Sequence, residues 1–248
     1  MEWSKAKSIL IMAFLALNIF LASQLFNART EQSQDDQATN TQEELNEIAT
    51  EADITILGKT PAEPPQVNSL KGSPVSFKEP WTNDTDGTWV QTFDPPLTVS
   101  GDREKTLNRY IDSLDNYVFQ PDESNDKRQV YYQRYGKNLI FDGKIEAKWK
   151  NKNHLTSLRQ SLFKVESQNG AKRPGVAATT TLINLIEKGQ IQKKETVTNI
   201  QLGYHSQSYD KKVRILQPMW RIQTKKHTFF VNAFNGAIES SVNETNHE

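Results

Sequence analysis

The chain reads MWRIQTKKHTFFVNAFNGAIESSV over residues 219–242, and this stretch decides the fold class. It is rich in aromatic and β-branched residues, a composition that favours β-strands. Asn235-Gly236 is typical of a type I′ hairpin turn. We therefore expect an antiparallel sheet here, with Trp220 and Phe230 in its core. The strands are predicted at 219–224, 228–233 and 238–242.

A helix and a further strand are expected directly before this sheet. Pro174 suits the first turn of the helix, and Gly189 ends it. One face of the helix is apolar and consists of Ala178, Leu182, Leu185 and Ile186. The strand is predicted over 196–205. After a connector at 169–173, these elements make residues 169–248 the second of two α+β units.

Residues 43–168 are predicted as the first unit, with the same order of helix, strands and Asx-Gly turn. Its helix covers 102–118, with Ser100 as cap. The apolar stripe of that helix consists of Leu107, Ile111, Leu114 and Val118. Strands are expected at 129–135, 139–141, 144–149 and 155–163. Asp142-Gly143 is the strongest hairpin signal among them. A shorter helix over 43–53 starts the unit.

Residues 60–100 hold seven prolines, which disfavours helices and predicts turns and short strands. An aromatic group stands out in this region, formed by Phe77, Trp81, Trp89 and Phe93. It has two interpretations: the wall of a groove for a peptide or glycan strand, or the buried face of the first unit.

Residues 8–26, SILIMAFLALNIFLASQLF, carry no charge and are long enough to cross a bilayer once. Lys5 and Lys7 precede this segment, so the positive-inside rule places residues 1–7 in the cytoplasm and the rest outside the cell membrane. A cleaved signal peptide is the alternative, although Leu21 is a poor residue at its −3 position. Residues 27–42 lack large apolar side chains and are predicted to be a flexible tether.

One face of the apolar segment carries Phe14, Asn18 and Ala22 at a spacing of four residues. An amide within a bilayer needs a hydrogen-bond partner, so these residues are a hypothetical helix-pairing site. The other interpretation is that Asn18 bonds to its own backbone or to water.

The composition disfavours several classes of function. Lys and Arg total 30 against 30 Asp and Glu, so no basic surplus indicates nucleic-acid binding. There is no cysteine, which excludes disulfides and thiol chemistry. The four histidines, at 154, 205, 227 and 247, lack metal-ligand spacing. Asp84-Thr85-Asp86-Gly87 resembles part of a calcium loop, but Thr82 and Phe93 occupy its end positions. We expect no enzyme, no cofactor and no metal.

The first residues, Met1 to Lys7, followed at once by the apolar segment, resemble the start of the YycI family. Further similarity lies in Leu185 to Gly189, Ile200 to Tyr204, Pro218 to Ile222 and Phe230 to Gly236. The last two stretches also resemble a PepSY module, a helix-plus-sheet domain of secreted and membrane proteins.

The resemblance implies a single-pass membrane protein of Gram-positive bacteria without catalytic activity. It implies that the protein works with the related YycH to regulate an essential sensor histidine kinase called WalK or YycG. The response regulator of this kinase, WalR (YycF), controls cell-wall metabolism. The alternative is a PepSY-type inhibitor or binding module at the cell wall without a kinase partner. A structural adaptor without signalling effect is a third interpretation.

Overall fold

The structure is a computed structural model, and it describes residues 2–58, 60–84, 87–111, 113–166, 171–206 and 212–243. The chain divides into two compact units. Unit 1 comprises Met1–Thr55, Lys59–Pro64 and Ala177–Glu195; unit 2 comprises Ile56–Gly58, Pro65–Val176 and Thr196–Glu248. This division differs from the predicted boundary after residue 168, because strands from both halves of the sequence pair within unit 2.

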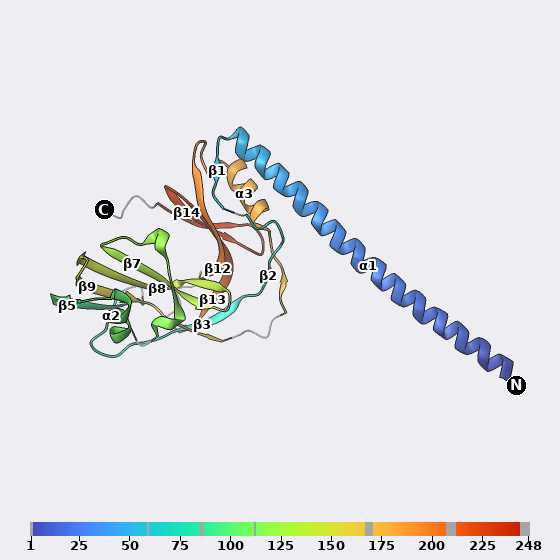
Figure 1. Cartoon of the computed structure of the whole chain (residues 1–248), viewed down its shortest axis with the longest axis horizontal. Coiled ribbons are helices and arrows are strands. Elements are labelled where there is room, and N and C mark those ends of the chain that lie inside the picture. The colour runs from blue at the N-terminus through green and yellow to red at the C-terminus, as the bar shows by residue number, and fades with distance from the viewer. Residues whose placement is uncertain are drawn as a thin grey trace. The chain divides into compact units, whose positions relative to one another are not determined.

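The fold is α+β, as predicted, and strands dominate it (Figure 1). The helices are α1 (Glu2–Glu51), α2 (Arg103–Tyr110) and α3 (Ala178–Glu187), with short 3-10 turns η1 (Leu114–Asn116) and η2 (Pro121–Glu123). The strands of the N-terminal half are β1 (Thr55–Ile56), β2 (Gln66–Val67), β3 (Leu70–Pro74), β4 (Thr82–Asn83), β5 (Trp89–Thr98), β6 (Tyr117–Phe119), β7 (Arg128–Tyr135), β8 (Asn138–Asn151), β9 (His154–Gln160) and β10 (Phe163–Glu166). The remaining strands are β11 (Arg173–Pro174), β12 (Thr196–Ser206), β13 (Arg214–Thr224), β14 (His227–Asn232) and β15 (Ile238–Asn243).

Unit 1 is built on α1, which packs its C-terminal part against α3. Leu45 and Ala49 of α1 and Leu182 of α3 are buried. The helix α1 continues through residues 27–42, where a flexible tether is predicted. The physical reason is that no glycine or proline occurs before Gly58, so nothing in the sequence ends the helix earlier.

Within the described residues, we find no helix with the length and apolarity needed to cross a membrane.

Unit 2 contains a mixed sheet with the strand order β10-β3-β13-β12-β8-β9-β5-β4. β13 also pairs with β14, β14 with β15, and β7 with both β6 and β8. The contact between β8 and β12 is parallel, with Gly203 opposite Leu139 and Tyr204 opposite Ile140. This parallel pair joins the two sequence halves, whereas the sequence predicts two separate antiparallel sheets.

The strongest predicted hairpin is wrong. Asp142-Gly143 lies inside the single strand β8, and the register of β7 against β8 jumps from Tyr132–Lys144 to Gln133–Ile140. Residues 141–143 therefore form a bulge with three residues outside the β7–β8 pairing. The side chain of Gln133 occupies the position where a Cβ of residue 143 would lie, which explains the glycine there.

The first predicted helix is shorter than its apolar stripe indicates. Asp102, rather than Ser100, caps α2 by accepting a hydrogen bond from the Glu104 backbone at 2.8 Å. The helix ends at Tyr110, because residues 117–119 pair with β7 as strand β6. Leu107, Ile111 and Leu114 nevertheless join one core with Ile145, Ala147, Trp149, Leu155 and Leu158.

Two other local predictions change in the second half. Pro174 lies in β11 and α3 begins later, at Ala178, although Gly189 follows its C-cap with φ +64° as expected. Gly236 has φ +70°, but Asn235 does not adopt positive φ, so the connection between β14 and β15 is a longer loop than a type I′ turn.

Candidate functional site

The predicted helix-pairing residues lie on α1. Phe14 is 66% exposed, and Asn18 is exposed as well. The side chain of Ala22 lies outside those that the structure describes. The described side chains do not test a pairing role for these residues, which stays a prediction.

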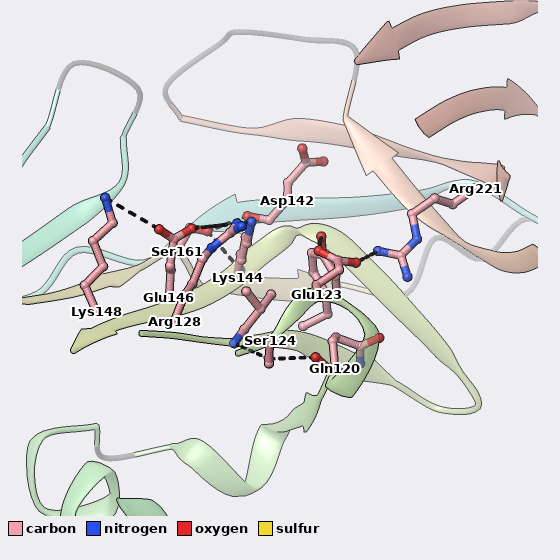
Figure 2. Close-up of polar contacts among 12 residues, drawn as sticks. Gln120, Glu123, Ser124, Arg128, Asp142, Lys144, Glu146, Lys148, Ser161 and Arg221 are labelled. Carbon is pink, nitrogen blue, oxygen red and sulfur yellow. Dashed lines mark hydrogen bonds and ion pairs between the residues drawn. The ribbon is translucent and has the colours of Figure 1, made fainter. Parts of the chain in front are cut away.

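A buried ion pair lies on the face of β13 opposite Trp220. Trp220 donates its indole N–H to the Val176 carbonyl at 2.8 Å, and the alternation of the strand turns Arg221 to the other side. The Arg221 side chain is 2% exposed and lies 2.6 Å from Glu123 Oε1 (Figure 2). Its second terminal nitrogen donates to Gln201 Oε1 at 2.9 Å.

Aromatic rings complete the surroundings of Arg221. Its guanidinium lies 4.8 Å from the ring centres of both Tyr132 and Phe141. The Tyr132 hydroxyl donates to Glu123 Oε2 at 2.8 Å, and burial together with the Glu123 charge raises the pKa of Tyr132. Both carboxylate oxygens of Glu123 are therefore bound. The cluster fixes η2 onto the sheet through paired charges.

A second charged cluster extends along β8. Glu146 lies 3.1 Å from Arg128, 3.6 Å from Lys144 and 3.8 Å from Lys148 (Figure 2). Burial favours the neutral carboxyl, but these three cations outweigh it and lower the pKa of Glu146. Burial and the neighbouring Arg128 lower the pKa of Lys144. Because three cations share one carboxylate, the cluster carries net positive charge.

The bulge of β8 places Asp142 between the ends of several strands. Its Oδ1 lies 2.9 Å from Nδ1 of His205, and its Oδ2 accepts a hydrogen bond from the Ser206 backbone at 2.6 Å. The Ser161 hydroxyl donates to the Asp142 carbonyl. His205 stacks on Phe230 with ring centres 4.7 Å apart. The bulge thus binds β12 and the start of the β9–β10 link at one point.

The His205–Asp142 pair predicts a pH-dependent stability. Burial lowers the pKa of His205, but the hydrogen bond and charge of Asp142 and the charge of Glu239 outweigh it and raise that pKa. The stabilisation is complete below the unfolded pKa of about 6.5 and disappears as the pH rises through the folded pKa. We expect His205→Gln to reduce the free energy of unfolding by about 1 kcal/mol more at about pH 5.5 than at about pH 8.5.

Urea denaturation of the natural chain and of the His205→Gln variant at the two pH values measures this difference. His154→Gln is the matched control, because the ring of His154 contacts the uncharged Asn151 at 2.7 Å. A His205→Gln effect of equal size at both pH values would contradict the charged pair.

A cavity of about 480 Å³ opens beside the bulge. It is lined by Pro74, Val75, Ser76, Asn83, Asp84, Gly87, Thr88, Trp89, Asp142, Ser161, Leu162, Phe163 and Arg214. These residues come from the β3–β4 link, the β4–β5 turn, the β8 bulge, the β9–β10 link and the start of β13. The cavity therefore forms where both sequence halves meet within unit 2.

The aromatic group of the proline-rich region divides between its two interpretations. Trp81 and Phe93 pack against the core under α2, which is the buried alternative. Trp89 lines the cavity. The ring of Phe77 contacts the ring of Trp89, with ring centres 5.9 Å apart. The core interpretation thus holds for Trp81 and Phe93, whereas for Trp89 the groove for a peptide or glycan strand stays a prediction.

The chemical motifs of the sequence give no metal site in the described part of the chain. No group of three or more His, Asp or Glu side chains there is placed to hold a metal ion. Asp84 and Gly87 form the turn between β4 and β5, with the Gly87 N–H donating to the Asp84 carbonyl at 3.2 Å. Thr85, Asp86 and His247 lie outside the described residues.

Comparison with known proteins gives one family and a set of similar solved structures, two of which follow. The model of the YycI protein family matches residues 30–234. No curated protein matches the chain. An uncharacterised protein from Eubacterium rectale is 9% identical with a TM-score of 0.46, covering 76% of this chain and 91% of its own. The C-terminal domain of YpeB from Bacillus megaterium is 12% identical with a TM-score of 0.35, covering 72% and 91% respectively.

Proposed function

Because this chain belongs to the YycI family, which is associated with the WalK two-component system, we propose that it is a membrane-anchored regulator of the sensor histidine kinase WalK. In this proposal the chain acts together with a YycH-like protein. The first residues lie in the cytoplasm, residues 8–26 lie in the bilayer, and the chain after residue 26 lies outside the cell.

The observation that carries the proposal is the surface of α1. Its large apolar side chains are exposed over residues 11–21, including Ile11, Met12, Phe14, Leu15, Leu17, Ile19, Phe20 and Leu21. Such a surface is stable only when lipid or other helices cover it. The uncharged sequence of residues 8–26 and the lysines before it fit the same arrangement.

The proposed mechanism needs no chemistry on a substrate. The chain contacts the same complex in the bilayer through α1 and outside it through unit 2. The first contact raises the effective concentration for the second, so two weak contacts together give a stable complex. The regulator shifts the kinase between signalling states by binding one state more tightly than the other.

Co-purification and transcription together test this proposal. We expect the tagged full chain, extracted from membranes, to retain WalK and the YycH-like protein, and its deletion to change WalR-dependent transcription. Absence of both effects would reject the kinase partner and favour a PepSY-type inhibitor or binding module at the cell wall. Association without a transcriptional change would instead indicate a structural adaptor.

Site-specific crosslinking tests the helix-pairing face. A photoreactive residue at position 18 is expected to give several-fold more crosslink to WalK or the YycH-like protein than one at Ala16, about 200° around the helix. Asn18→Leu is expected to weaken association, because the hydrogen bond between the Asn18 side-chain amide and the partner helix is lost. Equal crosslinking at both positions, or full association of Asn18→Leu, would contradict a pairing role for this face.

A further inference from the structure

The charges around the cavity beside the β8 bulge are unequally paired. Asp142 Oδ2 accepts a hydrogen bond from the Ser206 backbone, and its Oδ1 lies 2.9 Å from Nδ1 of His205. Asp84 accepts a hydrogen bond from Arg159 at 2.8 Å. Arg214, in contrast, makes no hydrogen bond or ion pair with another residue in the described ranges, and its Nε is shielded from solvent. Among the charged groups that line the cavity, the Arg214 guanidinium is therefore the one that the described residues leave without a hydrogen-bonding partner.

The position of Arg214 favours a planar anion. Its guanidinium lies 5.4 Å from the ring centre of Phe163. Stacking on the ring leaves the N–H groups at the edge of the guanidinium, where they match the two oxygens of a carboxylate. A buried or half-buried guanidinium without acceptors loses hydrogen bonds that it would make with water, so a bound anion restores them.

The rest of the wall combines apolar and polar side chains. Trp89, Leu162 and Val75 supply apolar surface, and Asn83 and Thr88 supply an amide and a hydroxyl. The volume of about 480 Å³ lies within the usual range of small-molecule sites. These walls suit a ligand with one carboxylate and one apolar group better than a bare inorganic anion.

We propose that this cavity is a binding site for a small amphiphilic carboxylate, held by its carboxylate on Arg214 and by its apolar group against Trp89 and Leu162. Two sources share this chemistry: the free C-terminus of a short peptide with an apolar last residue, and a fatty acid. The site is independent of the kinase contact proposed above.

Titration calorimetry on the purified full chain in lipid nanodiscs tests the site with defined probes. One pair of probes is an N-acetylated dipeptide ending in leucine, as free acid and as amide; the other is octanoate and octanamide. We expect at least one acid to bind and its amide to bind at least about tenfold more weakly, since a charge-assisted hydrogen-bond pair is lost. The acid that binds identifies the source.

Three variants locate the binding. Arg214→Met keeps an apolar stem and should weaken acid binding at least about tenfold, whereas Arg214→Lys keeps the charge and should weaken it less. Arg173→Met is the matched control, because Arg173 also stacks on a ring, 3.9 Å from the centre of Phe234, but does not line the cavity. Thermal unfolding confirms that each variant is folded.

The proposal is overturned if neither acid binds, if acid and amide bind equally, or if Arg214→Met binds the acid as tightly as the natural chain. Weakening by Arg173→Met as large as that by Arg214→Met also overturns it, since the bound site would then lie elsewhere.

Discussion

Arg221→Met is expected to lower the free energy of unfolding of unit 2 by about 3 kcal/mol, because removing one partner of a buried ion pair leaves the other charge uncompensated. Glu123 would keep only the Tyr132 hydroxyl, and Gln201 would lose its donor. The two rings beside the guanidinium would lose a stacking partner as well. Urea denaturation followed by circular dichroism measures the change.

Arg128→Met is the matched control for this prediction. Arg128 is an arginine of the same sheet whose partner, Glu146, retains Lys144 and Lys148 after the substitution. We therefore expect a loss of only about 1 kcal/mol. Adding Glu123→Gln to Arg221→Met should recover part of the lost stability, since the uncompensated charge is then removed. Equal losses for the two single variants would contradict the account of the buried pair.

Gly203→Ala is the second substitution with a large expected effect. A Cβ at position 203 would lie 2.7 Å from the Leu139 carbonyl oxygen and would overlap the ring of Phe141. The neighbouring backbone belongs to β8, whose parallel contact with β12 runs through this residue. We expect a loss of about 2 kcal/mol or more, because the strands must separate or Phe141 must move. Denaturation in urea again measures it.

Gly72→Ala provides the comparison at a second strand glycine. There the nearest atom to an added Cβ is Cδ1 of Leu216, at 2.9 Å, the end of a flexible side chain. The side chain can turn away, so the loss should stay below about 1 kcal/mol. If Gly72→Ala were as costly as Gly203→Ala, the backbone contact would not be the cause.

The sequence predicts the elements of this protein better than their partners. The strands at 129–135, 196–205 and 228–233 and the apolar face of α3 follow from local composition and periodicity, which are properties of adjacent residues. The bulge at Asp142-Gly143 does not follow from local composition, because the same residues also suit a hairpin turn. Contacts with Gln133 and with the strand β12, which are distant in sequence, favour the bulge instead.

The candidate site was harder to predict for the same reason. Arg221 and Glu123 are 98 residues apart, and no local pattern connects them. The available signal was an arginine between apolar residues in a core strand, which requires a buried partner. The cavity likewise combines Trp89, which the aromatic group indicated, with Arg214 and Asp142, which meet only through the sheet topology.

The unbroken helix α1 has a mechanical consequence if its first half is fixed in a bilayer. A continuous α-helix resists bending and twisting, so a rotation of the anchored end reaches the end packed on α3 with little loss. Each residue added between them turns the far end by about 100° and raises it by about 1.5 Å. The number of residues in the segment 27–42 then sets the angle at which the C-terminal end of α1 and the packed helix α3 are presented above the membrane.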